Sequence, residues 1–142
     1  MTAEESAEAA WERFRAASAD SRLSADNHEG RDGGGVQHVP SDELALPSLS
    51  RAEKAALVRH SLAVLERRYP GRSVEVRVVP FGAVQILEGA SHRRGTPPAV
   101  VEVDADTWLA LASGRANWAD AEASGQIDAS GERSDLSQLL PL

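Results

Sequence analysis

The chain of 142 residues carries a formal net charge of −7 and contains no cysteine. Its length suits one compact domain with additional segments, and the absence of cysteine excludes disulfides, thiolate nucleophiles and cysteine-ligated metals. The apolar runs are all shorter than the about 20 residues of a membrane-spanning helix, and the acidic N-terminus lacks the apolar core of a signal peptide. We therefore expect a cytoplasmic protein without stable membrane insertion.

The negative charge is concentrated in the first part of the chain. Residues 1–50 hold ten acidic residues and four arginines, a net −6, whereas residues 51–142 hold twelve acidic and eleven basic residues, a net −1. The second part is close to neutral and lacks the basic excess of a nucleic-acid-binding domain. Within it, residues 51–77 carry seven bases and three acids. That surplus suits either a solvated face or the anionic head of a ligand.

The N-terminal segment, residues 1–19, is predicted to form a short amphipathic helix. Ala7, Trp11, Phe14 and Ser18 recur with helical spacing and place the two aromatic side chains on one face. We expect this face to pack on the rest of the protein.

Residues 20–50 follow with a different composition. They are rich in Ser, Asp, Gly and Pro and poor in large apolar side chains, so little burial is available to offset the entropy of ordering them. We predict a flexible, acidic, glycine-rich linker. Its three consecutive glycines lack the flanking motif of a phosphate-binding loop.

Residues 51–142 show the pattern of one α+β domain. A helix is predicted over residues 51–69, with Ser50 as its N-cap and Glu53 completing a capping box. On this helix His60 is expected to be exposed. Alternating or continuous apolar runs predict strands at residues 74–78, 81–88, 99–103 and 126–130. We expect a small, mostly antiparallel sheet of four or five strands covered on one face by helices.

The helices of the last third are marked by caps. Asp104 and Asn117 are N-cap residues, and Gly114 and Gly125 follow the helices that they begin. A short leucine-rich helix is predicted over residues 134–140.

The order of motifs in this last third is distinctive. The motifs are Thr107-Trp108-Leu109, Gly114-Arg115, Trp118-Ala119-Asp120-Ala121, Gly125, Ile127, Ser130-Gly131, Asp135-Leu136 and Leu139-Leu140. This succession resembles the bacterial branch of the sterol-carrier-protein (SCP2-like) superfamily, and the resemblance covers roughly residues 51–142. It implies an SCP2-like fold in which the sheet and the helices enclose an apolar tunnel for a fatty acyl chain, a sterol or a similar lipid.

The resemblance suggests two groups of ligand-binding residues. The apolar cavity would be lined by Val84, Ile86, Trp108, Leu111, Trp118, Ile127, Leu136, Leu139 and Leu140. These residues are equally suited to an ordinary filled core. An anionic head group would be held by His92, Arg93 and Arg94, which otherwise form a polar hairpin loop.

No motif for catalysis or metal binding is present. The four histidines do not have the spacing of metal ligands, and a GxSxG nucleophile elbow is missing. Domains that resemble this one also occur in thiol-dependent isomerases and in some acetyltransferases, where the catalytic residues belong to a separate N-terminal domain, and we expect no such domain here. We expect a protein without enzyme activity, cofactor or metal that binds a lipid or acyl chain. The alternative is a protein-interaction or regulatory module with a filled core and no lipid ligand.

Overall fold

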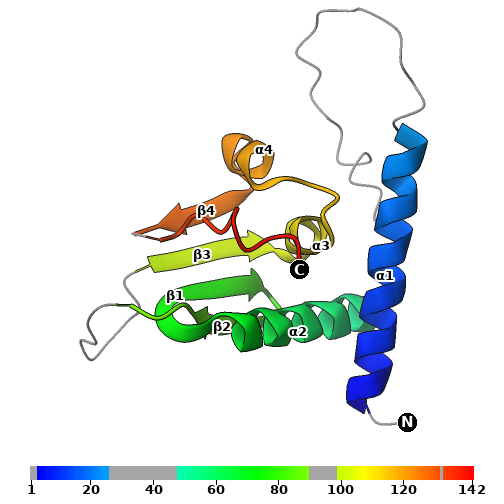
Figure 1. The fold of residues 1–142 in the computed structure, drawn as a ribbon, viewed down its shortest axis with the longest axis horizontal. Coiled ribbons are helices and arrows are strands. Elements are labelled where there is room, and N and C mark those ends of the chain that lie inside the picture. The colour runs from blue at the N-terminus through cyan, green and yellow to red at the C-terminus, as the bar shows by residue number, and fades with distance from the viewer. Residues whose placement is uncertain (1–2, 26–47, 90–98, 132) are drawn as a thin grey trace, which may run out of the picture.

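The computed structural model describes residues 3–25, 48–89, 99–131 and 133–142 (Figure 1). These residues form α1 (Ala3–Ala25), α2 (Arg51–Arg68), β1 (Pro70–Val79), β2 (Gly82–Ile86), β3 (Ala99–Asp104), α3 (Ala105–Ser113), α4 (Trp118–Ala123) and β4 (Ile127–Ser130). The α+β class predicted from the sequence is confirmed.

The described strands form one sheet in the order β2-β1-β3-β4. β1 pairs with β2 and β3 pairs with β4 in antiparallel fashion, whereas β1 and β3 run parallel at the centre. Parallel neighbours require a long connection, and here residues 80–98, which include β2, lie between β1 and β3 in the sequence. The sheet is therefore mixed but mostly antiparallel.

The two faces of the sheet differ in polarity. The register pairs Val74 with Ala99, Val76 with Val101 and Val78 with Val103, and all six side chains are buried. They face α2 and α3, both of which contact the central strands. Because side chains alternate along a strand, the opposite face carries the intervening residues, which include Glu75, Arg77, Glu102 and Asp128. One face thus builds the core and the other faces solvent.

The predicted caps of the helices are confirmed. The backbone N–H of Glu53 donates to Ser50 Oγ at 3.1 Å, and the backbone N–H of Ser50 donates to Glu53 Oε1 at 3.2 Å. Asp104 caps α3 by accepting from the Thr107 N–H at 2.7 Å. Asn117 caps α4 in the same way. These contacts satisfy backbone donors that have no partner within the helix.

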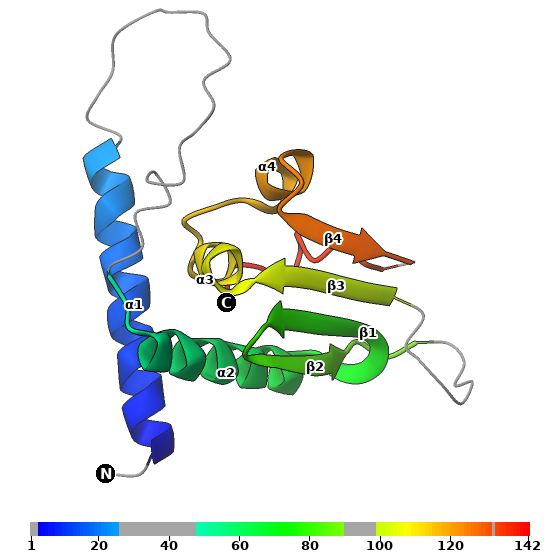
Figure 2. The same cartoon turned by 180° about the vertical axis from the view of Figure 1, so that it is seen from behind.

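Helix α1 is docked through its predicted apolar face. Trp11 and Phe14 are only 3% and 4% exposed, and α1 contacts α2 and α3. Figures 1 and 2 show α1 running across the N-terminal end of α2. α1 continues to Ala25 and so includes six residues that we had assigned to the linker, most of which lies outside the described residues.

The docking of α1 also changes the environment of His60. Its ring centroid lies 6.4 Å from that of Trp11, and the residue is half-buried rather than exposed. The apolar stripe of α2 correctly places His60 away from the sheet, but a second element covers that side of the helix.

The helix predicted over residues 134–140 is wrong. Residues 137–139 form a turn and residues 134–136 and 140 have no regular secondary structure. The Ser137 N–H donates to Asp135 Oδ1 at 2.9 Å, and the Leu139 N–H donates to Leu136 O at 3.0 Å. An aspartate that bonds the backbone two residues ahead favours a turn over a helix, and Pro141 prevents the helix from extending. We call residues 133–142 the C-terminal segment.

Candidate functional site

The nine side chains proposed to line a cavity come together in the structure. Ile86, Trp108, Leu111, Trp118, Ile127 and Leu136 are buried in one hydrophobic cluster, and Val84, Leu139 and Leu140 are partly buried against it. They come from β2, α3, α4, β4 and the C-terminal segment. We call this layer between the sheet and its covering elements the sheet–helix core.

The sheet–helix core is closed. Ile86, Trp108 and Leu136 have an exposure of 0%. A side chain that bordered an opening large enough for a water molecule would retain accessible surface there. These three side chains therefore line no open tunnel in this conformation.

Trp108 is held at the centre of this core by a buried hydrogen-bond chain. Its Nε1–H donates to Ser61 Oγ at 2.9 Å, and the Ser61 hydroxyl donates to Val58 O at 2.9 Å. Sequence reasoning missed Ser61. Ser61 lies four residues after Leu57 and four before Leu65, both buried, and this spacing indicates that it shares their buried face of α2.

The C-terminal segment forms one wall of the core without regular secondary structure. It inserts Leu136 and Leu142, which are both buried. The Leu142 N–H donates to Ala112 O at 2.9 Å, which connects the end of the segment to α3. Hydrogen bonds from the Ser137 backbone and side chain lower the pKa of Asp135 at the surface of this segment. Leu142 was not singled out from the sequence.

A second apolar feature is open. A groove of about 340 Å³ lies between α1 and α2. From α1 it is lined by Ala7, Ala10, Arg13, Phe14 and Ala17, and from α2 and the residues before it by Leu49, Glu53, Ala56 and Leu57. We call it the α1–α2 groove.

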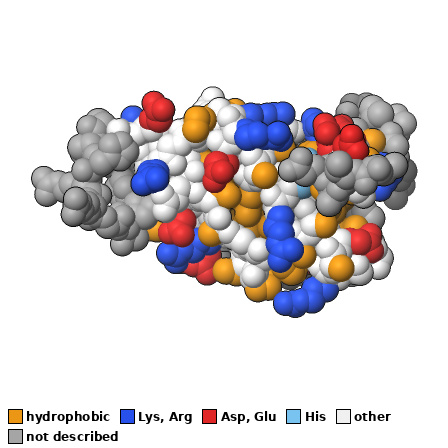
Figure 3. Space-filling view, turned by 90° about the horizontal axis from the view of Figure 1, so that it is seen from below, with side chains coloured by type: hydrophobic (Ala, Val, Ile, Leu, Met, Phe, Trp, Pro, Cys, Tyr) orange, Lys and Arg blue, Asp and Glu red, His pale blue; other side chains and the backbone are white. Residues whose placement is uncertain are grey.

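The outer face of α2 is basic and rich in alanine. Figure 3, which looks onto this side of the molecule, shows hydrophobic side chains gathered near the middle with Lys and Arg side chains among them. The exposed residues of α2 include Ala52, Ala56, Ala63, Arg59, Arg67 and Arg68. This face accounts for part of the basic surplus of residues 51–77.

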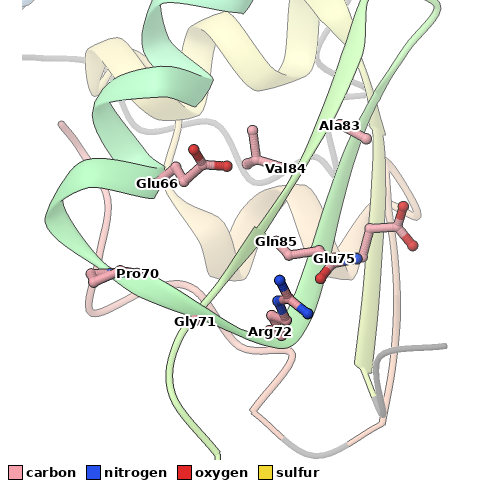
Figure 4. A pocket seen from close by; sticks show the side chains of 8 residues that line it. All are labelled: Glu66, Pro70, Gly71, Arg72, Glu75, Ala83, Val84 and Gln85. Atoms are coloured by element: carbon pink, nitrogen blue, oxygen red, sulfur yellow. The ribbon is translucent and has the colours of Figure 1, made fainter. Parts of the chain in front are cut away.

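A third hollow, of about 430 Å³, borders the edge strand β2 (Figure 4). It is lined by Glu66, Pro70, Gly71, Arg72, Glu75, Ala83, Val84 and Gln85. Gly71 shapes it, because its φ of +151° and a Cβ only 2.0 Å from the Leu87 backbone would exclude any other residue. Glu75 is already paired with Arg77 at 3.0 Å. The hollow is polar, mixed in charge and unsuited to an apolar chain.

His92, Arg93 and Arg94 lie outside the described residues. Within the described part of the chain, no group of three His, Asp or Glu side chains is arranged to hold a metal ion. No described helix is both long and apolar enough to cross a membrane.

Comparison with known proteins places this fold in a family. A search of curated proteins found no match to the chain. A family model described as "Bacterial SCP ortholog" matches residues 50–142, which include α2, the whole sheet, α3, α4 and the C-terminal segment. α1 precedes the matched residues. Because the match covers more than half of the chain, the protein belongs to the bacterial family of sterol-carrier-protein (SCP) orthologues.

Proposed function

We propose that this protein binds a lipid or acyl chain in the sheet–helix core without catalysing a reaction on it. One observation carries the proposal: the nine expected lining residues form one continuous apolar layer, and one wall of that layer is an irregular segment. Family membership supports the same class of ligand. In this proposal the ligand enters by displacing the C-terminal segment.

Replacing the buried leucines of the C-terminal segment by a ligand is expected to favour long acyl chains. Burial of a leucine side chain is worth roughly 1.5–3 kcal/mol, so withdrawing Leu136 and Leu142 costs about 3–6 kcal/mol. An acyl chain regains about 0.8 kcal/mol for each methylene that it buries. About four to eight buried methylenes are therefore needed to offset the two leucines. Short acids are expected to leave the core closed, whereas long ones open it.

The test is a fluorescence titration with octanoate, dodecanoate and hexadecanoate. A Trp11→Phe background leaves Trp108 and Trp118 as reporters, since both belong to the core. We expect a saturable shift in tryptophan emission for the long acids, because the ligand replaces neighbours of two indoles that are already buried. Affinity should rise by about two orders of magnitude for four added carbons until the core is full.

The variant Leu142→Ala tests the proposed wall. Removing this side chain should lower the free energy of unfolding by about 2 kcal/mol and raise the affinity for hexadecanoate about tenfold, because less burial has to be displaced. Val79→Ala is the matched control, because Val79 is 44% exposed at the end of β1. It should change neither quantity.

A second candidate function rests on the closure of the core. Trp108, Ile86 and Leu136 have no exposed surface, as in a protein interior packed for stability alone. If no fatty acid gives a saturable shift in either the parent or the Leu142→Ala protein, the core does not open. The protein would then be an interaction or regulatory module, and the lipid-binding proposal would be rejected.

A further inference from the structure

The α1–α2 groove differs from the sheet–helix core in the size of its walls. Four of its nine lining residues are alanines, at positions 7, 10, 17 and 56. Two helices that meet through alanine leave space that larger side chains would fill. Trp11 and Phe14, whose ring centroids lie 5.8 Å apart, secure α1 beside this space. The groove is thus held open by a docked helix.

One cation of the groove is not engaged by its neighbours. The residues three and four positions from Arg13 on α1 are Ala9, Ala10, Ala16 and Ala17, so no carboxylate lies within reach along the helix. The nearby acid Glu12 is bound by Arg15 at 3.1 Å. In the described part of the chain, Arg13 makes no ion pair.

The acidic side chain among the described lining residues of the groove, Glu53, takes part in the capping box of α2. Glu53 Oε1 accepts the backbone N–H of Ser50 in the capping box of α2. This bond holds the carboxylate at the N-terminus of α2 without neutralising it, so the groove carries one negative and one positive side chain. Of the two, only Arg13 can pair with an anionic group.

The volume of the groove limits what can occupy it. One turn of an α-helix is about 5.4 Å long and about 10 Å across, which requires more space than this groove offers. A groove of about 340 Å³ lies at the lower end of the range for small-molecule sites, about 300–1,000 Å³. An extended alkyl chain fits such a space, because it needs only a narrow apolar channel.

We propose that the α1–α2 groove is a second binding site, which takes one alkyl chain with an anionic head group held by Arg13. The chain lies along Ala10, Ala56 and Leu57, and the head group pairs with the guanidinium at the rim. Because α1 precedes the residues matched by the family, this site is built partly from residues outside the family domain. It does not require the C-terminal segment to move.

Calorimetric titration of the full chain with dodecanoate and with dodecanol, at low and high salt, tests the proposal. Arg13→Gln should weaken dodecanoate binding at least tenfold at low salt, because a charge-assisted contact is lost, and should leave dodecanol unaffected. Arg59→Gln is the matched control, since Arg59 is exposed on α2 and does not line the groove. It should behave as the parent protein does.

Ala56→Leu tests the channel itself. Ala56 is exposed, so a leucine there should fill the groove without disturbing the core. It should abolish the binding event of the groove for both compounds, while binding in the sheet–helix core remains. Ala63→Leu, at an exposed site on the same helix outside the groove, should change nothing. Unchanged melting temperatures would show that both variants remain folded.

Three results would overturn the site. Equal dodecanoate affinities of Arg13→Gln and Arg59→Gln would remove Arg13 as the anchor. Parent-like affinity in Ala56→Leu, together with altered affinity in Leu142→Ala, would place the ligand in the sheet–helix core and would leave the proposed function standing. Absence of any dodecanoate binding would reject the groove as a ligand site.

Discussion

The two apolar regions of this molecule are built from different side chains. The sheet–helix core brings together tryptophan, isoleucine, valine and leucine from strands, helices and the C-terminal segment, and it is closed. The α1–α2 groove is lined largely by alanine, and it is open. Large side chains interdigitate and remove space, whereas alanine side chains are too short to fill the space left between two helices that other contacts hold in place. A ligand that enters the core must displace buried side chains, whereas a ligand in the groove need not.

The largest expected effect of a single change lies in the core. Trp108→Ala should lower the free energy of unfolding by about 3–5 kcal/mol, because a buried indole is replaced by a cavity. Ser61→Ala should cost about 1–3 kcal/mol, since the Trp108 N–H would lose its acceptor in a buried position. Chemical denaturation measures both losses. A change below 1 kcal/mol for Trp108→Ala would contradict the closed core.

An intermediate effect is expected where α1 docks. Trp11→Ala should cost about 3 kcal/mol and release α1, because Trp11 and Phe14 supply its buried face. Hydrogen exchange should then show loss of protection confined to α1, and calorimetry should show loss of binding in the α1–α2 groove. Trp11→Phe is the control and should retain both. Fatty-acid binding in the sheet–helix core should survive in either variant, which separates the two regions.

The smallest expected effect concerns the pH dependence of the C-terminal segment. Hydrogen bonds from Ser137 lower the pKa of Asp135 in the folded state, so the carboxylate stabilises the fold above the unfolded pKa of about 4. This contribution is lost as the pH falls through the lower folded value. Because Asp135 is exposed, we expect only a few tenths of a kcal/mol.

Denaturation of the parent protein and of Asp135→Asn between pH 2 and pH 5 measures this contribution. The two curves should converge at the acidic end, where the aspartate is protonated. Equal stability at every pH would contradict a role for this hydrogen bond. Binding in the α1–α2 groove should not respond to the substitution.

Local signals in the sequence were sufficient for the helices that carry their own caps. Ser50, Asp104 and Asn117 each satisfy backbone groups within three residues, so no distant part of the chain is needed to recognise them. The alternation of valines in β1 likewise predicts which face of that strand is buried. The nine lining residues were predicted as a group because their apolar character and their order match a family pattern.

The wrong predictions, for residues 134–140 and for His60, have a different cause: contacts between distant parts of the chain. In the C-terminal segment, Asp135 and Pro141 favour turns over the helix that the leucines suggest, and burial of Leu136 and Leu142 in the core fixes that outcome. His60 is covered by a helix about fifty residues earlier in the chain. The α1–α2 groove likewise depends on how two separate helices cross.

The sequence by itself determined the family, the α+β class and the apolar set that forms the core, because these depend on residue type, spacing and neighbours along the chain. Only the tertiary structure decided the parallel pairing of β1 with β3, the closure of the core and the open groove beside α1. Whether a set of apolar residues closes or leaves space depends on the distances between elements. Those distances are fixed by packing among segments that are remote in the sequence.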